Sequence, residues 1–139
     1  MTDFPSHIKS VCVYCGSSAR VSDVYKDATR ELARFLAKQG IKVVYGGGRV
    51  GLMGLLADTV IEEKGYVIGV IPEYLVYKEL QHDFLNENHV VDSMHTRKKM
   101  MVDKADAFVI LPGGFGTLDE AFEIMTWRQL GMHEKPVVF

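Results

Sequence analysis

The chain alternates short apolar runs with helical patterns from end to end, and this alternation most constrains its fold. The apolar runs have no polar face, which is typical of strands covered on both sides in a parallel sheet. The stretches between most of them repeat their apolar residues at the helical period. Strands are expected at 8–14, 41–45, 66–71, 89–91, 106–111 and 135–139, and helices at 23–39, 51–64, 94–104 and 118–130.

This order predicts one α/β domain over residues 1–139, a three-layer α/β/α sandwich with a parallel sheet and right-handed crossovers. Pro72 is expected to break the third strand, and residues 73–87 read as an irregular polar segment with room for one short helix. The chain stops inside an apolar strand, so we expect either a natural continuation past Phe139 or a partner chain over that part of the sheet.

Composition narrows the function classes. The 139 residues are 47% hydrophobic and 24% charged, with a net charge of −2, which fits one globular domain and disfavours a nucleic-acid-binding protein. No apolar run approaches the roughly 20 residues that span a bilayer. The N-terminus has no basic stretch followed by an apolar block, so neither secretion nor a membrane is expected, and the cytoplasm is the predicted location.

Two cysteines, Cys12 and Cys15, form a CxxC pattern that invites redox or zinc readings. They lie in and just after an expected strand, however, and not at a helix start that would stabilise a thiolate. No second pair completes a tetrahedral site. We therefore expect two buried or strand-end thiols and no metal site.

Glycine-rich turns follow three of the strands, at Gly16, Gly46–Gly51 and Gly113–Gly116. The carboxyl ends of parallel strands share one edge of the sheet, which is where such folds bind ligands. Gly46–Gly51 also matches GxGxxG, with Glu73 near the distance of a ribose-binding acid, but three successive glycines satisfy that pattern easily. Phosphate or nucleotide contact is favoured; dinucleotide binding and a purely structural turn stay open.

Arg97, Lys98 and Lys99 lie in the first turns of an expected helix. Cations at that positive end cost about 0.3–1 kcal/mol each when exposed, and an anionic ligand would reverse the cost. Arg97 could hold a phosphate or carboxylate through two hydrogen bonds. The alternative is a solvated basic face, and neighbouring His95 reads as a surface or hydrogen-bonding residue.

The stretch from Leu111 to Glu120 reads as strand end, glycine turn and helix start. Its glycines and Thr117 can offer N–H groups and a hydroxyl to a phosphate, and Glu120 places a carboxylate within the same helix. The alternative is structural, because Thr117 and Glu120 also form the T-x-x-E pattern of a capping box. The two interpretations are compatible.

Residues 112–120 resemble the PGGxGTxxE signature of the LONELY GUY (LOG) family, and the similarity extends through 15–18, 46–48, 51–54 and 94–98. LOG proteins are cytokinin riboside 5′-monophosphate phosphoribohydrolases, long mislabelled as lysine decarboxylases. Nothing in this chain marks a lysine site for pyridoxal phosphate, so the decarboxylase label has no support in the sequence.

The resemblance implies a Rossmann-like homodimer that needs no cofactor and hydrolyses the N-glycosidic bond of an adenosine 5′-monophosphate, N6-substituted or not. The products would be the free base and ribose 5-phosphate. It implies catalytic roles for Arg97 and Glu120. Substrate contacts are expected from Gly16, Ser17, Gly47, Gly48, Met94, Lys98, Gly113, Gly114, Gly116 and Thr117.

Two alternatives of other classes use the same glycine turns. One is a non-catalytic carrier of a phosphorylated ligand, like the related molybdenum cofactor carrier proteins. The other is a dinucleotide-binding regulator. Only the hydrolase needs Arg97 and Glu120 for turnover.

Overall fold

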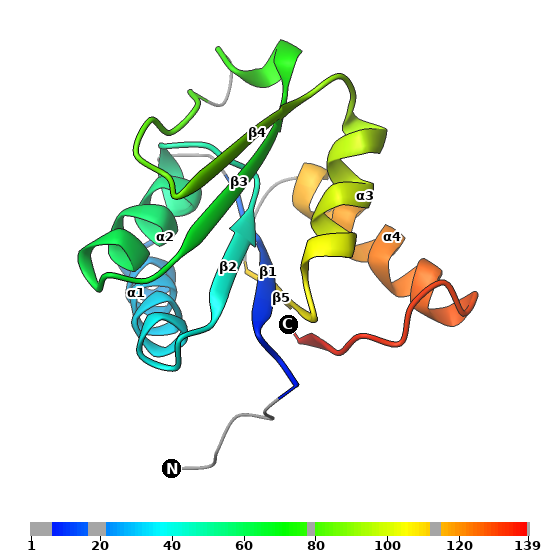
Figure 1. Ribbon diagram of the computed structural model, residues 1–139, viewed down its shortest axis with the longest axis horizontal. Helices are drawn as coiled ribbons and strands as arrows, with labels where there is room; N and C mark the ends of the chain where they lie inside the picture. The colour runs from blue at the N-terminus through cyan, green and yellow to red at the C-terminus, as the bar shows by residue number, and fades with distance from the viewer. Residues whose placement is uncertain (1–6, 17–21, 78–79, 112–114, 139) are drawn as a thin grey trace.

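The computed structural model describes residues 7–16, 22–77, 80–111 and 115–138, with residues 115–121 described through their backbone. In this part of the chain a six-stranded parallel sheet has the order β4-β3-β2-β1-β5-β6 (Figure 1). The strands are β1 Ser10–Tyr14, β2 Lys42–Tyr45, β3 Val67–Pro72, β4 Glu87–Val91, β5 Ala107–Ile110 and β6 Val137–Val138. The helices are α1 Asp23–Lys38, α2 Gly51–Glu62, α3 Met94–Lys104 and α4 Phe115–Gln129, with a 3-10 turn at Glu73–Leu75.

Helices cover both faces of the sheet, α1 and α2 on one side and α3 and α4 on the other (Figure 1). Because side chains alternate along a strand, each strand feeds two cores. Val11 and Val13 of β1 pack with α1 and α2, whereas Cys12 and Tyr14 pack on the α3 side. The predicted α/β fold with a parallel, helix-covered sheet is confirmed.

Two strand predictions needed correction. β3 runs through Pro72, because pairing with the four-residue β2 ends at Tyr45 opposite Gly69 and the proline lies beyond that ladder. β4 starts at Glu87, two residues before the predicted strand. It is an edge strand whose side chains alternate in exposure, and that hides it from a search for continuous apolar runs.

The cysteines are buried, as predicted, and lie on opposite faces of the sheet, since Cys12 belongs to the α3-side core and Cys15 to the α1/α2-side core. Across the described ranges, no helix combines the length and the apolar character needed to cross a membrane.

In the connection from β3 to β4, residues 80–86 form turns and bends where a helix would be usual. Residues 80–86 pass over the α1/α2 face, where Leu85 packs on the core and against Gly69. Asn86 accepts a hydrogen bond from the N–H of Val67 at 2.9 Å, which ties the segment to the start of β3. This segment also reaches the turn after β2.

Gly54 lets the backbone of α2 lie close to that of Arg49, because a Cβ there would overlap the carbonyl oxygen of Arg49. Alanine improves helix propensity by about 1 kcal/mol. We expect the overlap to outweigh that gain, so that Gly54→Ala lowers the free energy of unfolding by about 2 kcal/mol in urea titrations.

Gly40→Ala is the matched comparison, because a Cβ there meets open space and only the φ of +69° opposes it. That change should cost about 1 kcal/mol. A Gly54→Ala protein as stable as the wild type would contradict the close approach.

Candidate active site

All six strands are parallel, but the direction in which the chain adds them to the sheet reverses at β1. Strands β1 to β4 are added outward on one side, and β5 then pairs with the other side of β1. In a doubly wound sheet the ligand crevice opens at the carboxyl ends of such a pair. Gly16 follows β1 there, and the N–H of Met53 at the start of α2 donates to its carbonyl at 3.2 Å. Helix α4 follows β5. The predicted ligand edge therefore coincides with the switch point.

The turn Gly46–Gly48 after β2 is held by its carbonyl oxygens. Nη2 of Arg97 donates to Gly46 at 2.6 Å, the N–H of His82 donates to Gly47 at 2.8 Å, and the Tyr45 hydroxyl donates to Gly48 at 2.7 Å. In a trans peptide the next N–H points opposite to the carbonyl. The N–H groups of Gly47 and Gly48 therefore point away from these donors, an arrangement that suits an anion.

Glycine is required at the first position of this turn. A Cβ on Gly46 would overlap Nη2 of Arg97 and lie 2.9 Å from Cε of Met53. Gly47 has a φ of +81°, a conformation that glycine adopts readily. The glycines thus serve the close approach of a guanidinium as well as the shape of the turn.

Arg97 is 2% exposed, which excludes the solvated face considered for it. Its Nε donates to the carbonyl of Val70 at 2.9 Å, so one guanidinium bridges the carboxyl ends of β2 and β3. A two-bond grip on a phosphate by Nε and Nη2 would require both of these bonds to break. Nη1 lies 3.7 Å from Sδ of Met94, one turn earlier in α3.

The three successive cations do not form one patch. Lys98 makes an ion pair with Glu123 of α4 at 2.6 Å, with 18% and 26% of the side chains exposed, whereas Lys99 is exposed. Tyr14, Ile124 and Trp127 line the space around that ion pair and shield it partly from water. Lys98 therefore fastens α3 to α4.

The start of α3 carries its own negative charge. Ser93 caps the helix by accepting the N–H of Thr96 at 3.1 Å, and the Thr96 hydroxyl donates to Asp92 at 2.7 Å. That hydrogen bond lowers the pKa of the Asp92 carboxyl. The cost of cations at the helix start is thus offset within the protein by Asp92 and Glu123, without an anionic ligand. His95 is exposed, as predicted.

Glu120, Thr117 and Gly116 lie within the backbone of α4, while Ser17, Gly113, Gly114 and the side chains of Thr117 and Glu120 lie outside the described part of the structure. Since α4 begins at Phe115, Thr117 is its third residue and does not hold the N-cap position that a capping box needs. Glu120 stands one turn before Glu123 on the same face of α4, on the side nearer the carboxyl edge.

Sequence reasoning missed Tyr45, Asp58 and His82. Tyr45 ends an apolar strand and gave no sign of its bond to Gly48, and His82 lies in the segment that could not be interpreted. Among the described residues, no three His, Cys, Asp or Glu side chains come together as metal ligands.

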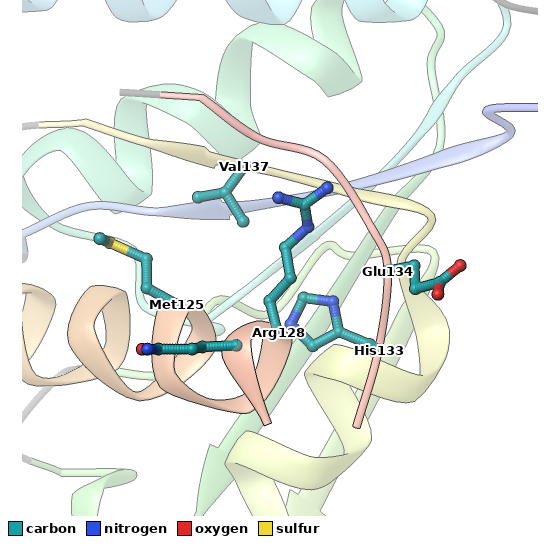
Figure 2. A pocket seen from close by; sticks show the side chains of 6 residues that line it. Met125, Arg128, His133, Glu134 and Val137 are labelled. Carbon is teal, nitrogen blue, oxygen red and sulfur yellow. The ribbon is translucent and has the colours of Figure 1, made fainter. Parts of the chain in front are cut away.

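A cavity of about 650 Å³ lies away from this edge. Figure 2 shows Met125 and Arg128 of α4 facing the segment that carries His133, Glu134 and Val137. Met125 and Arg128 belong to the last turns of α4, Val137 belongs to β6, and His133 and Glu134 lie in the connection between the two. The predicted site residues in α4 belong to its first two turns. This cavity therefore lies apart from the predicted site residues of α4.

The parallel helix-covered sheet and its switch point define a Rossmann-like α/β type of protein. A sequence model of the family described as "Possible lysine decarboxylase" matches residues 53–139. The chain belongs to this family. The molybdenum cofactor binding protein from Rippkaea orientalis has the same fold, with a TM-score of 0.76 at 20% identity over 96% of this chain and 77% of that one.

The predicted likeness to LOG proteins is confirmed. The chain is 48% identical over 132 residues to the probable cytokinin riboside 5′-monophosphate phosphoribohydrolase LOG6 of Arabidopsis thaliana, covering 95% of this chain and 66% of that protein. It is 47% identical over 135 residues to the phosphoribohydrolase LOG1 of the same plant, covering 97% and 63%. The chain thus spans just under two thirds of these relatives' lengths.

Arg97→Met tests the structural part of the arginine's role. The change leaves the carbonyls of Gly46 and Val70 without their buried donor, and we expect the free energy of unfolding to fall by about 2–4 kcal/mol. Lys99→Met, two residues later on the exposed side, should change it by less than about 0.5 kcal/mol. An Arg97→Met protein of wild-type stability would show that these two hydrogen bonds contribute little to the free energy of unfolding.

The pair of Lys98 and Glu123 can be measured with a double-mutant cycle of Lys98→Met and Glu123→Gln. We expect a coupling of about 1 kcal/mol, because both side chains are largely withdrawn from water. The exposed pair of Arg30 and Asp27 is the control and should give about 0.3 kcal/mol, lost in 1 M salt. Equal couplings for the two pairs would contradict a buried link between α3 and α4.

Proposed function

We propose that this chain carries a cytokinin riboside 5′-monophosphate phosphoribohydrolase activity. The substrate class is an adenosine 5′-monophosphate, with or without an N6 substituent, and water converts it to the free base and ribose 5-phosphate. The observation that carries the proposal is the 47% identity over 97% of this chain to a relative named for that activity.

The carboxyl edge supports nucleotide binding. The carbonyls of Gly46 and Gly47 accept hydrogen bonds from Arg97 and His82. The N–H groups of Gly47 and Gly48 in the same peptide units point the opposite way, so they suit a phosphate or ribose oxygen. We assign further substrate contacts to Gly16, Ser17, Met94 and Lys98. The 5′-phosphate is assigned to the stretch before and at the start of α4, with Gly113, Gly114, Gly116 and Thr117, because a helix start binds anions.

Glu120 is the proposed catalytic carboxylate. Breaking an N-glycosidic bond builds positive charge on the ribose ring, as in glycoside hydrolysis, and a fixed carboxylate stabilises that charge. The same group orients the water whose oxygen bonds to C1′. The departing base keeps the electrons of the broken C–N bond and takes up a proton.

Arg97 is assigned to orient the site. Its guanidinium is a buried cation that contacts the turn Gly46–Gly48. From there its field favours the ionised form of a carboxylate brought close to it, and its bond to Gly46 fixes the turn that the nucleotide would contact. Arg97 would therefore both fix the turn that contacts the nucleotide and act on the carboxylate beside it.

A homodimer is also proposed. Phe122, Leu130, Met132 and Val138 are apolar residues 57–69% exposed on α4, just after it, and on β6, which is the kind of surface that a second subunit covers. A cytoplasmic location stays a prediction of the sequence alone.

The carrier alternative has weaker support. Its structural relative shares 20% identity, a level that shows a common fold and no more. A carrier would bind a phosphorylated ligand on the glycine turns and release no base, so the same experiment separates the two functions.

Glu120→Gln keeps the size of the side chain and removes its charge. In assays of adenosine 5′-monophosphate and isopentenyladenosine 5′-monophosphate, with free base separated by chromatography, we expect turnover to fall at least ~10²-fold while the nucleotide still binds. Glu134→Gln, an exposed glutamate beside the larger cavity, is the control and should leave turnover unchanged.

Wild-type turnover in the Glu120→Gln protein would remove Glu120 from the mechanism. Nucleotide binding by the wild type without any release of base would favour a carrier.

A further inference from the structure

A second polar cluster reaches the glycine turn from the α1/α2 face. His82 is 4% exposed although it lies in a connecting segment. Its Nε2 lies 2.7 Å from Oδ1 of Asp58 on α2, and its Nδ1 accepts the N–H of Phe84 at 3.0 Å. None of these residues was assigned a role above in substrate binding or catalysis.

The two contacts settle the state of the ring. The N–H of Phe84 can only donate, so Nδ1 of His82 must be the acceptor and carries no proton. The ring proton therefore sits on Nε2 and donates to Asp58. Both ring nitrogens are used, which fixes the ring's orientation and ties segment 80–84 to α2.

The main chain of the same residue holds the glycine turn. The N–H of His82 donates to Gly47 at 2.8 Å, and the N–H of Arg49 donates to Leu80 at 2.9 Å, so Gln81 and Gly48 form a short antiparallel bridge. The carbonyl of His82 accepts from the Asn88 side chain at 3.1 Å. Whatever fixes His82 therefore fixes the carbonyl of Gly47, and with it the direction of the Gly48 N–H.

The turn is consequently clamped from both faces of the sheet. Arg97 of α3 holds Gly46 from one face, and His82 holds Gly47 from the other, where Asp58 of α2 steadies it. A cavity of about 210 Å³ borders the histidine and is lined by Arg49, Asp58, Asp83 and Phe84. Truncating the ring would enlarge this space and leave the Phe84 N–H without its acceptor.

We propose that His82 is a positioning residue that sets nucleotide affinity by holding the turn Gly46–Gly48. This inference rests on the proposed function, because it concerns the nucleotide contacts of the same edge. His82 acts through Gly47 and not on the reacting atoms, so its loss should appear in KM and not in kcat.

The test compares His82→Ala with His82→Asn in the same adenosine 5′-monophosphate assay. Alanine removes both ring contacts, and we expect KM to rise at least ~10-fold with kcat within ~3-fold of wild type. Asparagine can still accept the N–H two residues on, as in an Asx turn, and should restore KM to within ~3-fold of wild type.

Two further variants separate positioning from a general loss of packing. Asp58→Asn keeps an oxygen that can accept from Nε2 and should leave KM near wild type, whereas Asp58→Ala should raise it several-fold. Phe84→Ala is the matched control, because this ring is 80% exposed, borders the same cavity and forms no hydrogen bond to the turn. It meets the His82 ring edge-on, with 6.2 Å between the ring centroids, and leaves the backbone N–H of residue 84 in place. It should leave KM within about twofold.

An unchanged KM in His82→Ala would overturn the proposal. So would a fall in kcat as large as the rise in KM, or a His82→Asn protein whose KM stays as high as that of His82→Ala. If His82→Ala does not fold, the comparison of KM in Asp58→Ala and Asp58→Asn decides by the same criterion.

If the wild type binds adenosine 5′-monophosphate but releases no base, the proposed function fails, and calorimetric Kd values decide the positioning role. A ~10-fold weaker Kd in His82→Ala supports positioning, and an unchanged one contradicts it. A wild type that binds no nucleotide overturns both.

Discussion

The buried guanidinium of Arg97 is the interaction on which the ligand edge depends. It joins the carbonyl of Val70 in β3 to that of Gly46 after β2, and it leaves space at Gly46 for no side chain larger than hydrogen. A buried charge is tolerated only where polar groups surround it, and the ends of parallel strands supply carbonyls there. The hydrogen bond from Arg97 to Gly46 therefore both stabilises the buried charge and fixes the shape of the turn.

Much of the fold could be predicted from the sequence because its signals are local. The apolar run around Val11 and Val13, the helical periods and the glycine stops place β1, α1, α2 and α3 within a few residues. The extent of β3 through Pro72 could not, because it depends on where its neighbour ends. Exposure on the edge strand β4 likewise follows from its position in the sheet, which no local pattern records.

The site could be predicted less completely, since its partners are distant in the sequence. The carboxyl edge and the residue Arg97 came from motifs, but the arginine's acceptors lie 27 and 51 residues away, and they exclude the solvated face that the sequence left open as an alternative. The anions that offset its helix, Asp92 and Glu123, likewise became visible only once the helices were packed. His82 carries no motif, and its burial arises from contacts with α2 and the glycine turn.

The irregular segment at residues 80–86 has a consequence for how this edge can vary. A helix in that place would be tied to the core along its length, whereas this segment is joined to its surroundings by a few hydrogen bonds and Leu85. Segments of that kind open at a lower free energy than the sheet they cover. Substitutions there can retune the ligand edge across a lineage while the six strands and their two cores stay intact.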